Sequence, residues 1–140
     1  YVKFVVFLSL DLHAYEGGTL HFQMGGFTTE LKELVLKRLY YLKSIVIDKG
    51  VLQSLKKLRL EKIYNLKKVP LGIQNLVKLE NLTLWGVPTE VKQSIDPNGG
   101  QEHWMIQHVP SVAIADSFMV QRLEGFLEEE SMRILGFRRY

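Results

Sequence analysis

Leucines and other large apolar residues recur along this chain in a fixed pattern with a period of 24 residues. The pattern reads L-x-x-L-x-L-x-x followed by another apolar residue, and its copies begin at Leu31, Leu55 and Leu79. A weaker copy in the same register begins at Phe7 and ends at Tyr15. An L-x-L spacing breaks the stripe of an amphipathic helix but fits one face of a strand. The pattern therefore predicts one short strand in each copy.

Units that repeat at this length bury their apolar face only by stacking on their neighbours. We expect the L-x-L leucines to point into a shared core and the strands to form one parallel sheet on a concave side. The second half of a unit, such as residues 66–78, contains Pro70 and Gly72, which disfavour a long helix. The predicted fold is an α/β leucine-rich-repeat solenoid of about four 24-residue repeats, with short helical or 3₁₀ turns on an irregular convex side.

The carboxyl-terminal part is expected to close the last repeat with a strand and a helix. Thr89 is placed to cap a short helix that ends near Ile95, and residues 96–100 (DPNGG) form a turn signal. Residues 104–109 are interpreted as a last strand, and residues 117–135 have helical apolar spacing. The predicted division is repeats at 1–88, a capping segment at 89–115 and a helical tail at 116–140.

The first ten residues, YVKFVVFLSL, favour a buried strand over a secretory signal. They lack an initiator methionine, and no small-x-small cleavage site follows them. An exposed parallel edge carrying residues 4–7 would promote aggregation. We therefore expect the native protein to continue upstream, or a partner to cover this end.

Composition narrows the functional classes. The chain is 46% apolar and 24% charged, as in a globular domain, and its net charge of +3 is low for a dedicated nucleic-acid binder. There is no cysteine, which excludes disulfides and thiolate zinc sites; this fits a reducing compartment and is also compatible with secretion. No apolar stretch reaches the length of about 18 residues that a membrane-spanning helix needs.

Three segments carry a resemblance to a known family. The ending Ile95–Pro110 (IDPNGGQEHWMIQHVP) resembles the carboxyl terminus of plant coiled-coil nucleotide-binding leucine-rich-repeat immune receptors. The phrases LHAYEGGTLHFQMGGF at 12–27 and LKKVPLGIQNLVKLENLTLWGVP at 66–88 resemble the same family, so that the likeness covers about residues 7–112. The tail beyond Val112 matches no pattern that we recognise.

The resemblance implies a non-catalytic, cytoplasmic protein-recognition domain. In this family the repeats sense pathogen effectors or guarded host proteins and help to hold the nucleotide-binding module inactive, in some receptors at the inner face of the plasma membrane. The chain has no GxxxxGK followed by Ser or Thr, so ADP or ATP is expected only in a nucleotide-binding domain outside it. Two alternatives stay open: a truncated repeat protein acting as adaptor or decoy, and the substrate-binding end of a ubiquitin-ligase receptor.

Strand geometry places the residues beside the L-x-L leucines on the outward face of the sheet. We expect lateral columns there, such as Asp11, Val35, Arg59 and Thr83, and His13, Lys37, Glu61 and Trp85. Tryptophan beside cationic residues is favoured in binding hot spots. The predicted partner-binding residues are Lys37, Lys57, Arg59, Glu61 and Trp85. Packing under the cap is the favoured alternative for Trp85, and a solubilising role is the alternative for the cationic residues.

This region is also locally basic. Between Lys32 and Lys62 there are nine Lys or Arg residues against three Asp or Glu residues. Such a surface could bind an acidic effector or the receptor's own nucleotide-binding module. Tyr40, Tyr41 and Tyr64 lie among the lysines but at turn positions, which do not form an open stacking platform for nucleic acid.

Candidate catalytic and metal-binding residues do not form a recognisable set. His103 and His108 are five residues apart, which places them on opposite faces of a strand, and Glu102 is no established third ligand. A role in the terminal cap is favoured for both histidines, while His13 and His21 are isolated in the sequence. We therefore expect no enzyme activity and no metal.

Overall fold

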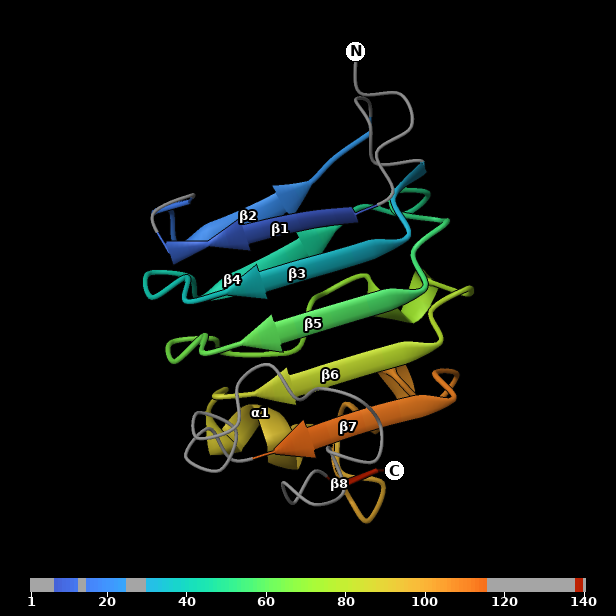
Figure 1. Cartoon of the computed structure of the whole chain (residues 1–140). Helices are drawn as coiled ribbons and strands as arrows, with labels where there is room; N and C mark the ends of the chain where they lie inside the picture. The colour runs from blue at the N-terminus through green and yellow to red at the C-terminus, as the bar shows by residue number, and fades with distance from the viewer. Residues whose placement is uncertain (1–6, 13–14, 25–29, 116–137, 140) are drawn as a thin grey trace.

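The computed structural model describes residues 7–12, 15–24, 30–115 and 138–139. Its main sheet has six strands in the order β1-β3-β5-β6-β7-β8 (Figure 1). They are β1 (Phe7–Asp11), β3 (Glu33–Lys37), β5 (Lys57–Glu61), β6 (Asn81–Trp85), β7 (Ser111–Ala115) and β8 (Arg138–Arg139). The first five are parallel and β8 is antiparallel to β7. The result is an α/β fold with a mostly parallel sheet and few helices, an architecture compatible with a repeat fold.

A second, two-stranded parallel sheet lies behind the first and was not expected (Figure 1). It contains β2 (Thr19–Phe22) and β4 (Ser44–Ile47), and a single bridge joins Val46 to Leu71. Beyond Leu71 the chain forms the 3₁₀ helix η3 (Ile73–Asn75). The predicted short turns are therefore present, but part of the side predicted to be irregular is a sheet.

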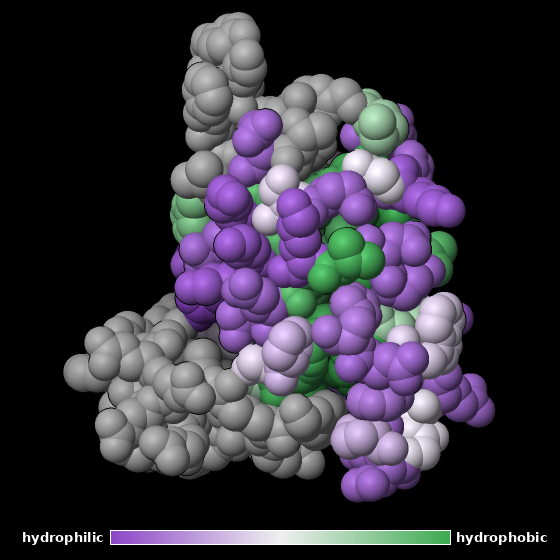
Figure 2. Space-filling view, turned by 90° about the vertical axis from the view of Figure 1, so that its right-hand side faces the viewer, coloured by the Kyte–Doolittle hydropathy of each residue, from purple (hydrophilic) through white to green (hydrophobic). Residues whose placement is uncertain are grey.

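The core lies between the two sheets. The leucines that point inward from β3, β5 and β6 are at most 1% exposed, and they are Leu34, Leu36, Leu58, Leu60, Leu82 and Leu84. Ile45 and Ile47 of β4 belong to the same cluster from the other side. On the side of the molecule where the main strands begin, apolar residues form a band between hydrophilic ones (Figure 2). At about 25 cal/mol per Å² of apolar surface removed from water, this burial is the main force that holds the sheets together.

The strand register agrees with the predicted period in the middle of the sheet and departs from it at both ends. Glu33 pairs with Lys57 and Lys57 pairs with Asn81, which are steps of 24 residues. Phe7 pairs with Glu33, a step of 26, so the predicted register of the first copy is wrong by two residues. Because side chains alternate along a strand, a slip of two keeps the same face inward but changes every lateral neighbour. The step from Asn81 to Ser111 is 30 residues.

The end of the described chain differs in part from the expectation. The predicted helix forms as α1 (Thr89–Ser94), but Pro88 occupies the N-cap position and Thr89 makes no capping bond. The strand predicted at 104–109 is wrong, since this segment contains the 3₁₀ helix η4 (His103–Met105) and further turns, and the strand follows it as β7. The buried residues of the segment at 104–109, Met105, Ile106 and Val109, do not alternate as one face of a strand requires.

The predicted tail helix at 117–135 lies outside the described residues. Arg138 and Arg139, which follow it in the sequence, pair with Ile114 and Ala113 of β7. Within the described part of the chain, no helix is long and apolar enough to cross a membrane.

Candidate protein-binding face

The outward face of the main sheet consists of three lateral rows, because paired residues on parallel strands lie side by side. The first row contains Phe7, Glu33, Lys57, Asn81 and Ser111, the second contains Ser9, Val35, Arg59, Thr83 and Ala113, and the third contains Asp11, Lys37, Glu61, Trp85 and Ala115. The predicted neighbours of Val35 and Lys37 are wrong. Val35 lies beside Ser9 and not Asp11, and Lys37 lies beside Asp11 and not His13. His13 is outside the described residues. The register slip of β1 causes both corrections.

The five predicted binding residues come together around β5. Lys37, Glu61 and Trp85 are consecutive in the third row, and Arg59 and Lys57 lie on the strand that carries Glu61. The Arg59 Nη2 atom is 2.6 Å from Glu61 Oε1. Because these side chains are two residues apart on one strand, they share a face, and the pair holds the guanidinium along β5.

These five residues differ in access to solvent. Lys57 is exposed, and Lys37 and Arg59 are half-buried. Glu61 is 5% exposed and Trp85 is 1% exposed, so the prediction that these two present an open surface is wrong. The accessible part of the predicted site is therefore its cationic part.

Trp85 packs against the turn that follows β5. Its ring lies 5.2 Å from the Nζ atom of Lys62, the first residue after β5. This distance is within the range of a cation–π interaction. Among the buried side-chain atoms of the described residues, the Trp85 indole nitrogen and the Arg59 Nε atom are two that have no hydrogen-bond partner. Both atoms belong to outward-facing residues of the neighbouring strands β5 and β6.

An ion pair at the other end of this face was not predicted. Arg38 donates from Nε to Asp11 Oδ1 at 2.8 Å and from Nη2 to Asp11 Oδ2 at 2.5 Å. The hydrogen bond from Arg38 lowers the pKa of Asp11 below its usual value, and burial opposes this only in part. The pair ties the edge strand β1 to the turn after β3. No pattern in the sequence predicted it, because the pairing depends on the shifted register of β1.

His103 and His108 have structural contacts. His103 Nδ1 lies 3.0 Å from the carbonyl oxygen of Ile95, and His108 Nε2 lies 3.0 Å from that of Leu76. A carbonyl oxygen only accepts, so each imidazole donates and ties its own turn to another segment of the chain. Glu102 instead pairs with Lys68 at 3.6 Å. Within the residues that the structure describes, no group of three His, Cys, Asp or Glu side chains could hold a metal ion.

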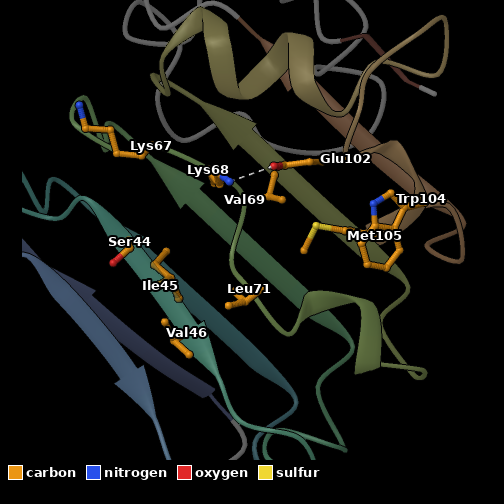
Figure 3. A pocket seen from close by; sticks show the side chains of 10 residues that line it. All are labelled: Ser44, Ile45, Val46, Lys67, Lys68, Val69, Leu71, Glu102, Trp104 and Met105. Carbon is orange, nitrogen blue, oxygen red and sulfur yellow. Dashed lines mark ion pairs between the residues drawn. The ribbon is translucent and has the colours of Figure 1, made fainter.

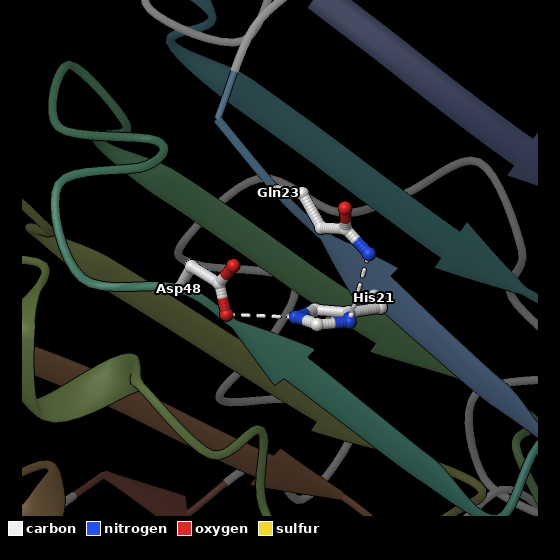
Figure 4. Close-up of polar contacts among 3 residues, drawn as sticks. All are labelled: His21, Gln23 and Asp48. Atoms are coloured by element: carbon white, nitrogen blue, oxygen red, sulfur yellow. Dashed lines mark hydrogen bonds and ion pairs between the residues drawn. The ribbon is translucent and has the colours of Figure 1, made fainter.

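His21 is not isolated, contrary to the prediction. Its Nε2 atom is 2.7 Å from Asp48 Oδ1, and the Gln23 side-chain amide lies 3.1 Å from Nδ1 (Figure 4). If the amide nitrogen donates to Nδ1, Nε2 carries the proton that is donated to the carboxylate. The contact joins β2 to the turn after β4 at the exposed surface. It strengthens the second sheet where the backbone pairing of β2 and β4 ends.

The tyrosines on the turns form a short stack. The rings of Tyr40 and Tyr64 are 5.8 Å apart and nearly parallel, and Asn65 donates from its side chain to the Tyr40 carbonyl oxygen at 2.6 Å. Burial raises the pKa of Tyr64. The two tyrosines are 24 residues apart, so the period of the sequence could have predicted this pairing.

Comparison with known proteins finds a similarity to a plant disease resistance protein. Over 100 residues, or 71% of this chain, the sequence is 31% identical to the disease resistance protein RPM1 of Arabidopsis thaliana. The match spans 11% of that protein's length. No family model matches the chain, and no solved structure matches it. The chain is thus similar to one region of a plant disease resistance protein.

Proposed function

We propose that this chain is part of the leucine-rich-repeat recognition region of a plant intracellular immune receptor, and that it binds proteins without catalysing a reaction. One observation carries this proposal: β3, β5 and β6 are paired with a step of 24 residues, and each places two fully buried leucines in the shared core. This is the arrangement that stacked repeats require, since each repeat buries its apolar face against the next. The identity with the disease resistance protein supports the same function.

The cationic part of the outward face is the proposed contact surface. Lys57 is exposed and Lys37 is half-buried, and they lie on neighbouring strands. A cationic patch attracts an acidic protein surface and disfavours a basic one. The partner is a pathogen effector, a guarded host protein or the receptor's own nucleotide-binding module.

The test is a charge reversal in the native protein that contains this chain. The variant carries Lys37→Glu and Lys57→Glu, and the control carries Lys49→Glu and Lys78→Glu, which change the same charge at exposed positions outside the three rows. Both are expressed in leaves of the source plant at matched protein levels. We expect only the first variant to cause cell death without a pathogen, or to abolish resistance that the native protein confers. Equal behaviour of both variants would contradict the proposal.

A further inference from the structure

A groove of about 410 Å³ opens on the side of the molecule that carries the second sheet (Figure 3). One wall is β4, the floor is the segment at 67–71, and the opposite wall is the segment at 102–105. Its volume is within the range of about 300–1,000 Å³ that is typical of ligand pockets. The groove contains none of the outward-facing residues of the main sheet, so it is separate from the proposed contact face.

The groove is apolar where it meets solvent. Leu71 is 57% exposed and Trp104 is 55% exposed, and both line it together with the half-buried Val46. Large apolar residues that gather in a hollow mark binding sites more often than single exposed ones do. Leu71 is also held in place, because its N–H donates to the Ile45 carbonyl at 2.9 Å and its own carbonyl accepts from Ile47 at 2.7 Å. The site is therefore preorganised, which lowers the entropic cost of binding.

The rim of the groove has an excess of positive charge. Lys67 and Lys68 are exposed and line it, and Lys43 adjoins them, since its carbonyl accepts from the Lys67 N–H at 2.9 Å. Among the described residues that line the groove there is one carboxylate, Glu102, which pairs with Lys68 at 3.6 Å. An acidic ligand fits such a rim, and a basic ligand would be repelled.

We propose that this groove is a second protein-docking site, and that it binds a short segment of a partner protein in which a large apolar side chain is flanked by carboxylates. The apolar anchor lies between Leu71 and Trp104, and the carboxylates pair with Lys67 and Lys43. This site goes beyond the proposed recognition by the sheet face. A receptor with both sites could bind one protein on the face and a different one behind it.

The test is a selection from a display library of random twelve-residue peptides on the native protein. We expect the enriched peptides to combine a leucine or aromatic residue with neighbouring aspartate or glutamate. Leu71→Glu should weaken them about tenfold or more, as is usual at the centre of an interface. Val77→Glu is the matched control, because Val77 is 73% exposed and does not line the groove. Circular dichroism and urea unfolding establish that both variants fold.

Two further readouts separate the parts of the proposal. Trp104 is more than half exposed and Trp85 is buried, so binding should shift the fluorescence of the native protein to shorter wavelength but not that of Trp104→Phe. Lys67→Glu should weaken the peptides, and Lys78→Glu should not. Enrichment of basic peptides, no enrichment, or equal binding to the Leu71→Glu and Val77→Glu variants would overturn the proposal. So would a concentration-dependent dimer that Leu71→Glu abolishes, since the occupant would then be a second copy of the chain.

Discussion

At the amino end of the main sheet, the outward side chains of β1 and β3 are exposed or half-buried, apart from the buried Val35, and three of them are charged. At the carboxyl end, four of the six outward side chains of β6 and β7 are closed: Thr83, Trp85, Ala113 and Ala115 are at most 6% exposed, and Asn81 and Ser111 are half-buried. The strands have the same length, and their inward residues are all apolar. The strand pattern thus determines which way a side chain points, but not whether a partner can reach it. The two ends should consequently respond differently to the same kind of substitution.

The largest difference is expected within a single lateral row. Trp85→Ala should lower the free energy of unfolding by about 3–5 kcal/mol, because it removes the largest fully buried side chain of this face. Lys37→Ala, two strands away in the same row, should change it by less than about 0.5 kcal/mol. Urea unfolding of the native protein measures both values. Similar losses at the two positions would show that the ends of the face are equally closed.

Substitution of the inward leucines should also cost more at the carboxyl end of the sheet than at the amino end, but the difference in unfolding free energy should be smaller. Leu84 of β6 is fully buried, whereas Leu10 of β1 is only partly buried against the core. Leu84→Ala should cost about 2–5 kcal/mol and Leu10→Ala about 1–2 kcal/mol. The same unfolding experiment compares them. A larger loss at Leu10 would mean that β1 is as tightly packed as the middle of the sheet.

The middle of the fold could be predicted from the sequence, and its ends could not. The L-x-L leucines predicted the strands, their parallel pairing and their inward face, because an alternating pattern can bury its apolar residues in one orientation only. The register of β1 was missed because Leu8, Leu10 and Leu12 offer two equivalent placements, and pairing across the sheet decides between them. For the same reason the Asp11–Arg38 pair was missed.

The candidate site was only partly predictable, for a related reason. The residues that gather around β5 follow from the period, but the burial of Glu61 and Trp85 depends on tertiary packing that no single strand encodes. The groove joins segments at 44–46, 67–71 and 102–105. The last of these was interpreted as a strand, so no pattern in the sequence could have shown that Trp104 and Leu71 line one groove.

A moderate effect on stability is expected at the turn that follows β6. Arg38 and Lys62 adopt left-handed backbone angles, with φ of 55° and 54°, and Gly86 occupies the equivalent position after β6 with φ of 71°. A Cβ atom on Gly86 would lie 2.8 Å from Lys62 Cα, so Gly86→Ala should cost about 1–3 kcal/mol. Gly99→Ala is the control, because its φ is also positive but nothing lies within 4 Å of an added Cβ. Equal losses in urea unfolding would show that backbone conformation, and not the close approach of the turns, requires glycine at position 86.

The smallest effect is expected at the open end, where Asp11 and Arg38 are still partly solvated. The pKa of Asp11 is lower in the folded state than the value near 3.9 of an unfolded chain. As the pH falls, the unfolded chain therefore binds this proton first. The stabilisation is complete above the unfolded pKa and is lost as the pH falls through the folded pKa.

Asp11→Asn should accordingly lower the free energy of unfolding at pH 7 by no more than about 1 kcal/mol, because solvent screens the pair. The difference from the native protein should shrink as the pH falls below about 4. Urea unfolding of both proteins between neutral pH and the acid limit of the folded state measures this trend. A difference that stays constant with pH would mean that Asp11 acts by packing and not by charge. A difference of several kcal/mol would mean that the edge strand is as closed as the opposite end of the sheet, since only a desolvated ion pair is so costly to break.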